Sequence, residues 1–442
     1  MTAEPPVPGL AGEADGASDV ERAARRERLQ RRTVRVLVAS QVLGGVGVGS
    51  GVAVVGLLAY ELSGTASLSG VSATASTLGA AVAAILIARL SVARGRRPGL
   101  VTGYVVGAGG AAVAVVAAVL GLFWLHVVAS AAFGWASASN LQARYAATDL
   151  ALPGNRARSL STIVWATTVG AVLGPNLTGP GEAVAATLSL PALSGAYLFS
   201  LGSFLAAAAV QFALLRPDPL HVVRAHAAVP AVATTGWEGI RTALVTIRSS
   251  PEATVAVLAI TAAHAVMVGI MVMTPVHMEH LGAALNLVGL TISLHIAGMY
   301  ALSPVMGALA DRMGRREVVL LGLAQLAVAA LLAATGDPTG SVWFQGGLVL
   351  LGTGWSSCLI AGSAWLTDAV AVEDRPSVQG TSDLAMNLAG GVGGTLAGIV
   401  LAIAGYPALA FGALVLLVPA AVGAWRLGGT AQPTTSGGAR GD

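Results

Sequence analysis

Residues 307–316, GALADRMGRR, decide the fold of this chain. They end a long apolar segment with one acid, Asp311, and a cluster of arginines. The arginines are Arg312, Arg315 and Arg316. A similar stretch, ARLSVARGRR, ends another apolar segment at residues 88–97, 219 positions earlier, and keeps the basic end but has Val92 in place of the acid. Two such stretches indicate that the chain contains an internal repeat.

Other polar residues support the repeat at the same offset of 219 residues. Asp149 then aligns with Asp368, and Arg156 aligns with Arg375. Each pair falls in a loop that follows the fourth apolar segment of its half. Several loop features at one offset predict two related halves, which is a common plan among transporters with a central binding site.

The composition places these segments in a membrane. Apolar residues make up 55% of the chain and charged residues only 10%, whereas a soluble protein has about 25% charged residues. A spanning helix needs about 20 mostly apolar residues. Twelve segments qualify: 35–61, 67–90, 99–121, 123–146, 159–180, 189–215, 252–277, 286–310, 317–335, 341–366, 377–404 and 407–427. We therefore expect an all-α integral membrane protein with twelve transmembrane helices in two pseudo-symmetric halves of six.

The arginines predict the orientation of these helices. With an even number of spans, both termini lie on one side, and the loops on that side hold Arg94, Arg96, Arg97, Arg156, Arg158, Arg216, Arg224, Arg241, Arg248, Arg312, Arg315, Arg316 and Arg375. The loops on the other side hold only the acids Glu61, Glu182, Glu279 and Asp337. Because cytoplasmic loops are enriched in basic residues, we expect a plasma-membrane protein with both termini in the cytoplasm.

These spans divide the chain into five parts. We expect a disordered basic tail over 1–34, a six-helix half over 35–215, a cytoplasmic linker over 216–251, a second half over 252–428 and a disordered tail over 429–442. The N-terminal residues lack the apolar core of a signal peptide. The single cysteine, Cys358, excludes an intramolecular disulfide. The basic run before the first span is expected to lie beside the lipid bilayer, and no nucleic-acid partner is expected.

No motif in the sequence indicates an enzyme. The phosphate-binding pattern G-x-x-x-x-G-K-[ST] is absent, which argues against a pump driven by ATP. No Cys-x-x-Cys metal-binding pattern is present, because the chain has one cysteine. We therefore expect no cofactor.

The quoted stretch resembles the G-x-x-x-D-R-x-G-R-R loop signature of the major facilitator superfamily. In that family the signature follows the second helix of a half, and here it follows the eighth span. Residues 170–175, GAVLGP, are similar to the family's G-x-x-x-G-P element, which is associated with exchange-type export. Helix packing explains that element equally well. The resemblance implies a secondary transporter that works by alternating access, in which two halves rock about a central site.

The loop residues are candidates for the switch between the two states of such a transporter. An acid and several arginines at a helix end can pair across the cytoplasmic face and break apart during rocking. The candidates are Asp311, Arg312, Arg315, Arg316, Asp149, Arg156, Asp368 and Arg375. The arginines serve equally well to set the topology alone. Arg144 belongs to the same cluster and is expected to join a structural ion network.

Methionine and histidine concentrate in the seventh and eighth spans. Met267 and Met271 lie four residues apart, as do His295 and Met299, so each pair shares a helix face. His264 lies near the first pair. Neutral thioether and imidazole ligands suit copper, and a histidine inside a membrane is a functional candidate. Methionine also serves as flexible packing filler, and facing of the two pairs does not follow from the spacing.

These four residues also resemble the paired Met-x-x-x-Met and His-x-x-x-Met motifs of the CcoA-like branch of the superfamily. That resemblance implies copper as the cargo and import as the direction. Relatives of the same branch resemble riboflavin transporters, so the alternative cargo is a small organic molecule, taken up like riboflavin or expelled like a drug with proton coupling. A membrane metal sensor that does not transport is a minor alternative.

Further polar residues are candidates for the path or its mouth. His277, Met278 and His280 lie at the predicted outer end of the seventh span, where they either collect a cation or form an ordinary polar helix end. Within the spans, the candidates for a proton or substrate path are Gln41, Asn140, Asn176, Asp383 and Asn387. Asp383 either carries a proton or pairs with a neighbouring arginine.

Overall fold

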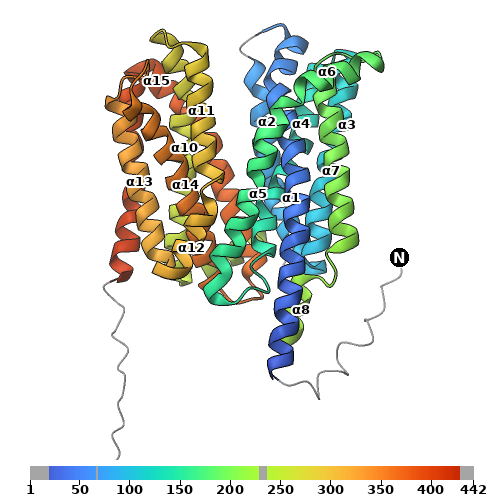
Figure 1. Cartoon of the computed structure of the whole chain (residues 1–442), viewed down its shortest axis with the longest axis vertical. Coiled ribbons are helices and arrows are strands. Elements are labelled where there is room, and N and C mark those ends of the chain that lie inside the picture. Colours follow the sequence, from blue (N-terminus) through green and yellow to red (C-terminus); the bar gives the residue numbers. More distant parts are fainter. Residues whose placement is uncertain (1–18, 66–67, 228–235, 429–442) are drawn as a thin grey trace, which may run out of the picture.

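The computed structural model describes residues 19–65, 68–227 and 236–428, and these are helical apart from turns (Figure 1). The first bundle contains α1 (Asp19–Ser63), α2 (Ser69–Arg94), α3 (Arg96–Leu120), α4 (Phe123–Ala146), α5 (Arg156–Asn176), α6 (Thr178–Thr187) and α7 (Ser194–Leu214). A short 3-10 turn, η2 (Pro153–Asn155), precedes α5.

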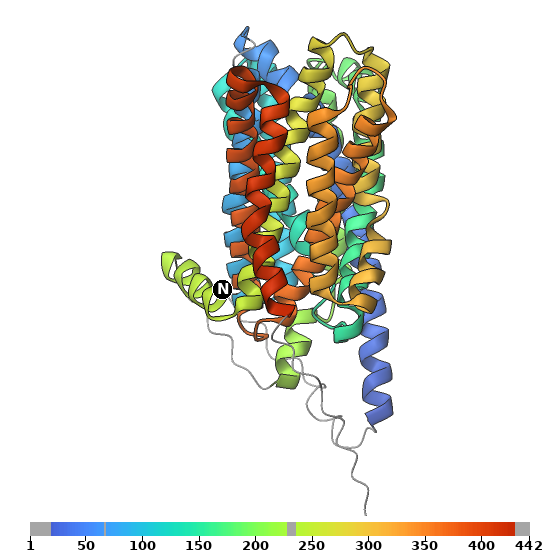
Figure 2. The same ribbon diagram turned by 90° about the vertical axis from the view of Figure 1, so that its left-hand side faces the viewer.

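The second bundle follows a linker that holds two short helices, α8 (Pro219–Ala227) and α9 (Gly236–Ser249). Its helices are α10 (Pro251–His280), α11 (Leu285–Tyr300), α12 (Ser303–Met313), α13 (Arg315–Thr335), α14 (Val342–Asp368) and α15 (Arg375–Gly428). The two bundles stand side by side with their helices upright (Figures 1 and 2).

Each of the twelve predicted spans corresponds to a helical segment. By length and composition, nine described helices can cross a membrane, or ten when the bent pair of α5 and α6 counts as one span. The total is below twelve for two reasons. The helix α15 counts once although it breaks at Gly405, where φ is 80°, between two predicted spans. The helix α4 does not pass because its second half, ASASNLQARYA, is polar.

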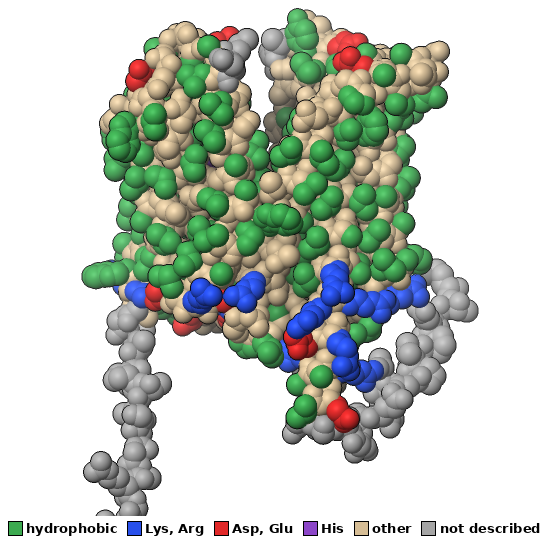
Figure 3. All heavy atoms as spheres, in the orientation of Figure 1, with side chains coloured by type: hydrophobic (Ala, Val, Ile, Leu, Met, Phe, Trp, Pro, Cys, Tyr) green, Lys and Arg blue, Asp and Glu red, His purple; other side chains and the backbone are tan. Residues whose placement is uncertain are grey.

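The surface agrees with a membrane protein. Large apolar side chains are exposed on the outward faces of the helices, such as Val113 on α3, Val328 on α13 and Val415 on α15. Figure 3 shows apolar side chains over the middle of the visible face and arginines gathered in a band at one end. We call this end the Arg-rich end and the other the opposite end.

The predicted N-terminal tail is wrong in one respect. The structure leaves residues 1–18 undescribed, but α1 already begins at Asp19, inside the segment expected to be disordered. Arginine, glutamate, alanine and leucine in this run are good helix formers. In addition, Arg26 Nε donates to the Leu150 carbonyl (2.9 Å) and Gln30 Nε2 donates to the Ala147 carbonyl (2.8 Å), which fixes the helix against the loop after α4. The predicted C-terminal tail, 429–442, lies outside the described residues.

The G-x-x-x-G-P element packs one helix against another. A Cβ atom on Gly170 would lie 2.2 Å from the Gly45 backbone, and one on Gly174 would lie 2.5 Å from the Gly49 backbone. The helices α1 and α5 therefore touch through backbone atoms, which only small residues allow. The packing explanation accounts for these glycines.

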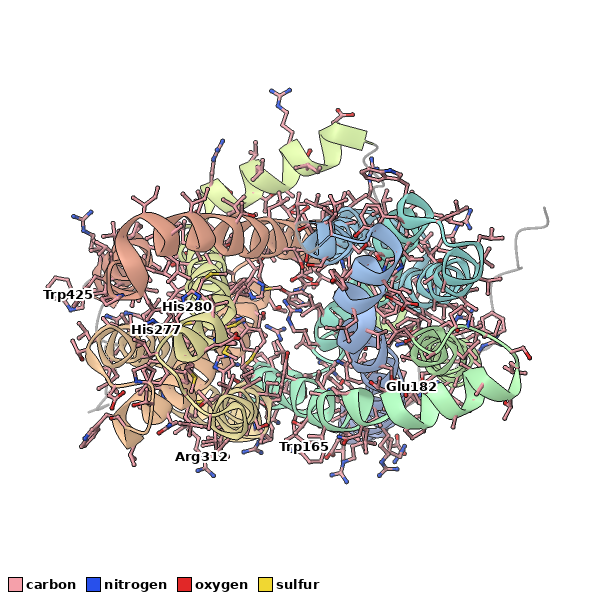
Figure 4. All side chains as sticks on the ribbon, turned by 90° about the horizontal axis from the view of Figure 1, so that it is seen from above. Trp165, Glu182, His277, His280, Arg312 and Trp425 are labelled. Carbon is pink, nitrogen blue, oxygen red and sulfur yellow. The ribbon has the colours of Figure 1, made fainter. Side chains whose placement is uncertain are left out.

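The two bundles meet along two seams. One seam joins α2 to α15, and the other joins α5 to α11 and α12. Figure 4, seen from the opposite end, shows α9 lying outside the bundles, and α9 contacts α15. The two seams frame a central space between the bundles, where the site is to be sought.

Candidate functional site

A hollow opens between the bundles at the opposite end (Figure 3). In this part of the molecule lies a cavity of about 230 Å³. Its lining residues are Gly51, Val52, Val55, Ala73, Ser76, Thr77, Ala80, Ser130, Phe133, Ser137, Tyr197 and Asn387. They come from α1, α2, α4 and α7 of the first bundle, and Asn387 comes from α15 of the second. The cavity thus involves both bundles, and its lining combines apolar groups with hydroxyls and an amide but no charged side chain.

An aromatic wall supports one side of this cavity. The Phe133 ring packs edge-on against the Tyr197 ring at 5.9 Å and against the Phe204 ring at 5.1 Å, between ring centroids. Gly51 makes room for Phe133, because a Cβ there would lie 2.4 Å from the ring. The Tyr197 hydroxyl is buried and makes no hydrogen bond. A buried hydroxyl without a partner is costly, so this group is available for a hydrogen bond to a molecule bound in the cavity.

The predicted path residues separate into two groups. Asn387 lines the cavity, and its Nδ2 donates to the Asp383 carbonyl (2.7 Å). The others bind neighbours away from it. Asn140 accepts from the Tyr104 hydroxyl (2.6 Å), and Gln41 Nε2 donates to the Thr167 hydroxyl (2.9 Å). Asn176 donates to the Val172 carbonyl one turn back.

At the Arg-rich end, the two halves repeat the same ion pair. Arg96 Nε lies 2.9 Å from Asp149 Oδ2 in the first bundle, and Arg315 Nε lies 3.1 Å from Asp368 Oδ2 in the second. These residues align at the offset of 219 found in the sequence. Arg156 of the first bundle also pairs with Asp368 of the second. Arg96 in turn donates to Gln379 of α15 (2.7 Å), so each repeated pair is linked to the other bundle.

Asp311 adds a second connection between the bundles. Its carboxylate accepts the backbone N–H groups of Ala157 (3.2 Å) and Arg158 (2.8 Å) at the start of α5. A carboxylate at a helix N-terminus is stabilised by the free N–H groups and the helix dipole. Arg315 binds the same carboxylate (2.5 Å) and also donates to the Pro153 carbonyl (2.5 Å). We call Arg156, Asp311, Arg315 and Asp368 the closing network.

Three other predicted switch residues lie beside this network. Arg312 is exposed on the side of the molecule (Figure 4). Arg316 binds the Ala424 carbonyl (2.6 Å) and Glu317 within its own bundle. Arg375 is buried and donates to the Thr367 carbonyl (3.1 Å). None of the three makes a hydrogen bond or ion pair to the first bundle among the contacts of the described chain.

A buried ion pair lies deeper between the bundles. Arg144 of α4 lies 2.6 Å from Asp383 of α15, and each side chain is 1% exposed. The Tyr145 hydroxyl lies 3.1 Å from the same guanidinium. Of the two roles expected for Asp383, the structure shows the pairing with arginine. Sequence reasoning placed Arg144 in an ion network but missed this partner, because 239 residues separate the two positions.

The copper candidates lie on α10 and α11, and these two helices do not pack against each other as adjacent helices would. Both α10 and α11 pack on α14, which lies between them, and they barely touch each other. His295 of α11 hydrogen-bonds through Nδ1 to the Leu348 carbonyl of α14 (2.9 Å). Met267, Met271 and Met299 pack in or against the apolar core of the second bundle. None of these four residues is among those that line the cavity.

His264 and His295 differ in whether a ring nitrogen keeps a free lone pair. Trp355 Nε1 of α14 donates to His264 Nδ1 (2.9 Å). An indole nitrogen can only donate, so a neutral His264 carries its proton on Nε2 and has no lone pair left. His295, in contrast, binds a carbonyl through Nδ1, which must carry the proton, and its buried Nε2 has no partner. Of these two histidines, only His295 has a ring nitrogen with a free lone pair, which can bind a metal ion or accept a hydrogen bond.

The residues at the opposite end of α10 are held by packing. The His277 ring stacks on Tyr406 with centroids 4.2 Å apart, and the Tyr406 hydroxyl lies 2.8 Å from Thr274. Met278 is fully buried, and His280 is exposed at the end of the helix (Figure 4). Within the described residues, no group of three or more His, Cys, Asp or Glu side chains is arranged to hold a metal ion.

Comparison with known proteins finds matches that cover most of the chain. The family model described as Major Facilitator Superfamily matches residues 36–283 and 256–441. A Bacillus subtilis protein, the uncharacterized MFS-type transporter YdeG, is 37% identical over 401 residues, which cover 90% of this chain and 93% of that protein. The riboflavin transporter RfnT of Brucella anthropi is 28% identical over 360 residues, covering 80% of this chain and 85% of that protein.

Solved structures share the fold at low identity. The human organic anion transporter MFSD10 superposes with a TM-score of 0.70 and is 18% identical, covering 89% of this chain and 99% of that one. At this identity the likeness concerns the fold alone.

Proposed function

Because the chain belongs to the Major Facilitator Superfamily and is therefore a multi-pass secondary transporter, we propose that its cargo is a small uncharged organic molecule with an aromatic ring system. The observation that carries this proposal is the cavity between the bundles. Its lining offers Phe133 and Tyr197 for ring contacts and the hydroxyls of Ser76, Thr77 and Ser130 for hydrogen bonds. A site of mostly apolar groups with a few polar ones is typical for such ligands.

The unpartnered Tyr197 hydroxyl favours a cargo molecule that carries a hydrogen-bonding group. It accepts or donates one hydrogen bond, and Asn387 offers an amide on the facing bundle. A cargo molecule that bridges the two would hold both bundles at once, as alternating access requires. Riboflavin, the cargo named for the relative from Brucella anthropi, has the ring system and the hydroxyls for such a site, so it is the first molecule to test.

The orientation follows from the arginines. We propose that the Arg-rich end faces the cytoplasm of a bacterial cell and that both termini lie there. The closing network then seals the cytoplasmic side, and the hollow at the opposite end is open to the outside. We also propose that the two six-helix halves comprise residues 35–215 and 252–428.

The test is uptake of radiolabelled riboflavin by a bacterial strain that requires riboflavin and lacks its own transporter. Cells that express this chain should accumulate several times more label than cells with empty vector. The variant Asn387→Ala should lose most of this uptake, because Asn387 lines the cavity. The matched variant Asn176→Ala should keep it, because Asn176 binds its own helix at the end of α5. Equal label in expressing and control cells would exclude riboflavin as the cargo.

Copper remains a second candidate cargo because of His295. Its Nε2 is buried without a partner while Nδ1 is fixed by a backbone carbonyl, the arrangement that orients a histidine ligand of a metal. The apolar packing of Met267, Met271 and Met299 limits this proposal. Copper uptake measured by mass spectrometry in the wild type and in the double variant Met267→Ala, His295→Ala tests it. Cellular copper that does not change on expression of the wild type would reject it.

A further inference from the structure

A small pocket lies between α2, α9 and α15, at the seam where the two bundles meet. Among its lining residues, Ile85 and Arg89 come from α2, Ile240 comes from α9, and Ser377 and Thr381 come from α15. Its volume of about 20 Å³ gives room for one water-sized group. The pocket therefore involves the first bundle, the linker and the second bundle, and it shares no lining residue with the larger cavity.

This pocket lies near the Arg-rich end, close to the outer surface of the bundles. Arg89 stands five residues before the end of α2, which is about 7.5 Å along the helix. Ser377 is in the first turn of α15, which starts at the same end. Figure 2 shows α9, in yellow-green, projecting from the side of the bundles near this end. In a membrane, this is the depth at which lipid headgroups meet the acyl chains.

Arg89 carries a positive charge that the chain does not balance. Its side chain is half-buried and makes no hydrogen bond or ion pair among the contacts of the described residues. The pocket lining contains no acid. The internal repeat explains neither fact, because the position aligned with Arg89 in the second half is Ala308. An acid is missing from the same face of α2, since Val92 stands where the second half has Asp311.

The polar groups in the pocket suit an anion with several oxygen atoms. A guanidinium presents several N–H donors in one plane and binds phosphate well. The Ser377 hydroxyl makes no hydrogen bond within the described chain and can donate as well. The Thr381 hydroxyl donates to the Ser377 carbonyl (2.9 Å) and keeps its lone pairs. One phosphate oxygen fits the pocket, and the rest of the group would remain at its mouth.

The surface next to Arg89 suits the acyl chains of a lipid. Val82 and Leu86 lie seven and three residues before Arg89, on the same side of α2, and both are exposed. Ile85 and Ile240 add apolar surface inside the pocket. A molecule bound here therefore meets a charged group at one end and an apolar helix face at the other, as an amphipathic ligand requires.

The exposed face of α9 favours a ligand with negative charge. Arg241, Val245 and Arg248 lie on one face of the helix, and all three are exposed. Neither arginine forms an ion pair among the described residues. Glu238 is the only acid of α9, so two arginines and one acid leave this helix a net charge of +1. Basic groups at this depth attract anionic lipids, and basic pockets between spanning helices bind their headgroups.

We propose that this pocket binds the phosphate group of an anionic phospholipid from the leaflet at the Arg-rich end. Arg89 holds the phosphate, Ser377 donates a second hydrogen bond, and the acyl chains lie along Val82 and Leu86. Because the lining comes from both bundles and from the linker, the bound lipid also holds α9 against the seam. This inference does not depend on the nature of the cargo or on the direction of transport.

Native mass spectrometry of the purified full chain in a neutral detergent tests the proposal. Dioleoyl phosphatidylglycerol and dioleoyl phosphatidylcholine have the same acyl chains and both contain a phosphate, but only the first has a net negative charge. The wild type should bind one phosphatidylglycerol several times more tightly than phosphatidylcholine. Excess glycerol phosphate, which lacks acyl chains, should not displace it. Equal binding of the two lipids, or displacement by glycerol phosphate, would overturn the proposal.

Variants assign the binding to Arg89. Arg89→Gln should weaken phosphatidylglycerol binding roughly tenfold, because a charged hydrogen bond is lost, and Arg89→Lys should keep part of it. Arg94→Gln is the matched control, since Arg94 lies on the same helix, is exposed and lies outside the pocket. If Arg89→Gln does not fold, Ser377→Ala should weaken binding about threefold. Unchanged binding in the pocket variant, or an equal loss in Arg94→Gln, would reject the site.

Discussion

Asp311 and Val92 occupy equivalent positions in the two halves, and only Asp311 binds the other bundle. Its carboxylate accepts two N–H groups at the start of α5. The equivalent start of α15 reads RPS, so Pro376 stands in place of Ala157 and has no N–H to offer. The Val92 carbonyl instead accepts Arg224 of the linker helix α8 (2.7 Å). The loss of the acid and the loss of one donor therefore go together. At this seam the bundles are instead linked by Arg96 of α3, which donates to Gln379 of α15 (2.7 Å).

Asp311→Asn should weaken the closure of the Arg-rich end. The amide keeps the size of the side chain but loses the charge that binds Arg315 and the α5 N-terminus. Ser161 of α5 is fully buried near α12, where a Cβ on Gly307 would lie 2.2 Å from its hydroxyl. In a Cys358→Ala background, Ser161→Cys should react with a soluble maleimide about tenfold faster when Asp311→Asn is added, since charged hydrogen bonds contribute about 1.5–3 kcal/mol.

The control for that experiment is Asp337→Asn. Asp337 lies in the loop between α13 and α14 at the opposite end, where its carboxylate accepts from the backbone N–H and the hydroxyl of Thr339. It should leave the maleimide rate unchanged. Equal rates with and without Asp311→Asn would show that Asp311 does not hold the bundles together.

Gly170→Val should destabilise the protein. The added side chain would meet the Gly45 backbone at about the position of the Cβ, 2.2 Å away, and helix backbones cannot yield as a flexible side chain would. Overpacking of this kind costs about 1–3 kcal/mol or more. The melting temperature in detergent, followed by fluorescence-detected size exclusion, should fall by several degrees. Gly202→Val on α7 has open space at its Cβ and should melt like the wild type.

His264 and His295 should differ in copper binding if copper binds at all. Titration of purified protein with Cu(I) against a competing chelator should show weaker binding for His295→Ala, because its Nε2 is the free one. His264→Ala should bind as the wild type does, because Trp355 occupies its lone pair. Equal loss in both variants would contradict the assignment of their tautomers.

The fold followed from the sequence because its signals are local or repeated. Apolar length predicted the twelve segments. The offset of 219 residues aligned Arg96 and Asp149 with Arg315 and Asp368, and the structure has the same ion pair in both bundles. The segment 19–34 was the exception, because its polar composition looked unstructured while its contacts to Leu150 and Ala147 are tertiary.

The site was harder to predict because it depends on which helix lies between two others. Spacing placed His295 and Met299 on one face of their helix, but it gave no sign that α14 separates α11 from α10. Trp355 and Tyr197 were missed, since an aromatic residue in an apolar segment gives no distinctive signal. Asn387 was identified, because an amide inside a span is unusual wherever it points.

The most direct test of the central claim is the affinity of purified protein for riboflavin, measured by quenching of flavin fluorescence in the wild type, Tyr197→Phe and Tyr60→Phe. Tyr197→Phe removes only the unpartnered hydroxyl at the cavity, and Tyr60→Phe removes a hydroxyl from an exposed ring at the end of α1. We predict binding by the wild type, roughly twofold to tenfold weaker binding by Tyr197→Phe, as expected for one lost hydrogen bond, and no change in Tyr60→Phe. No binding by the wild type, or equal affinity in all three proteins, would contradict the proposed cargo site.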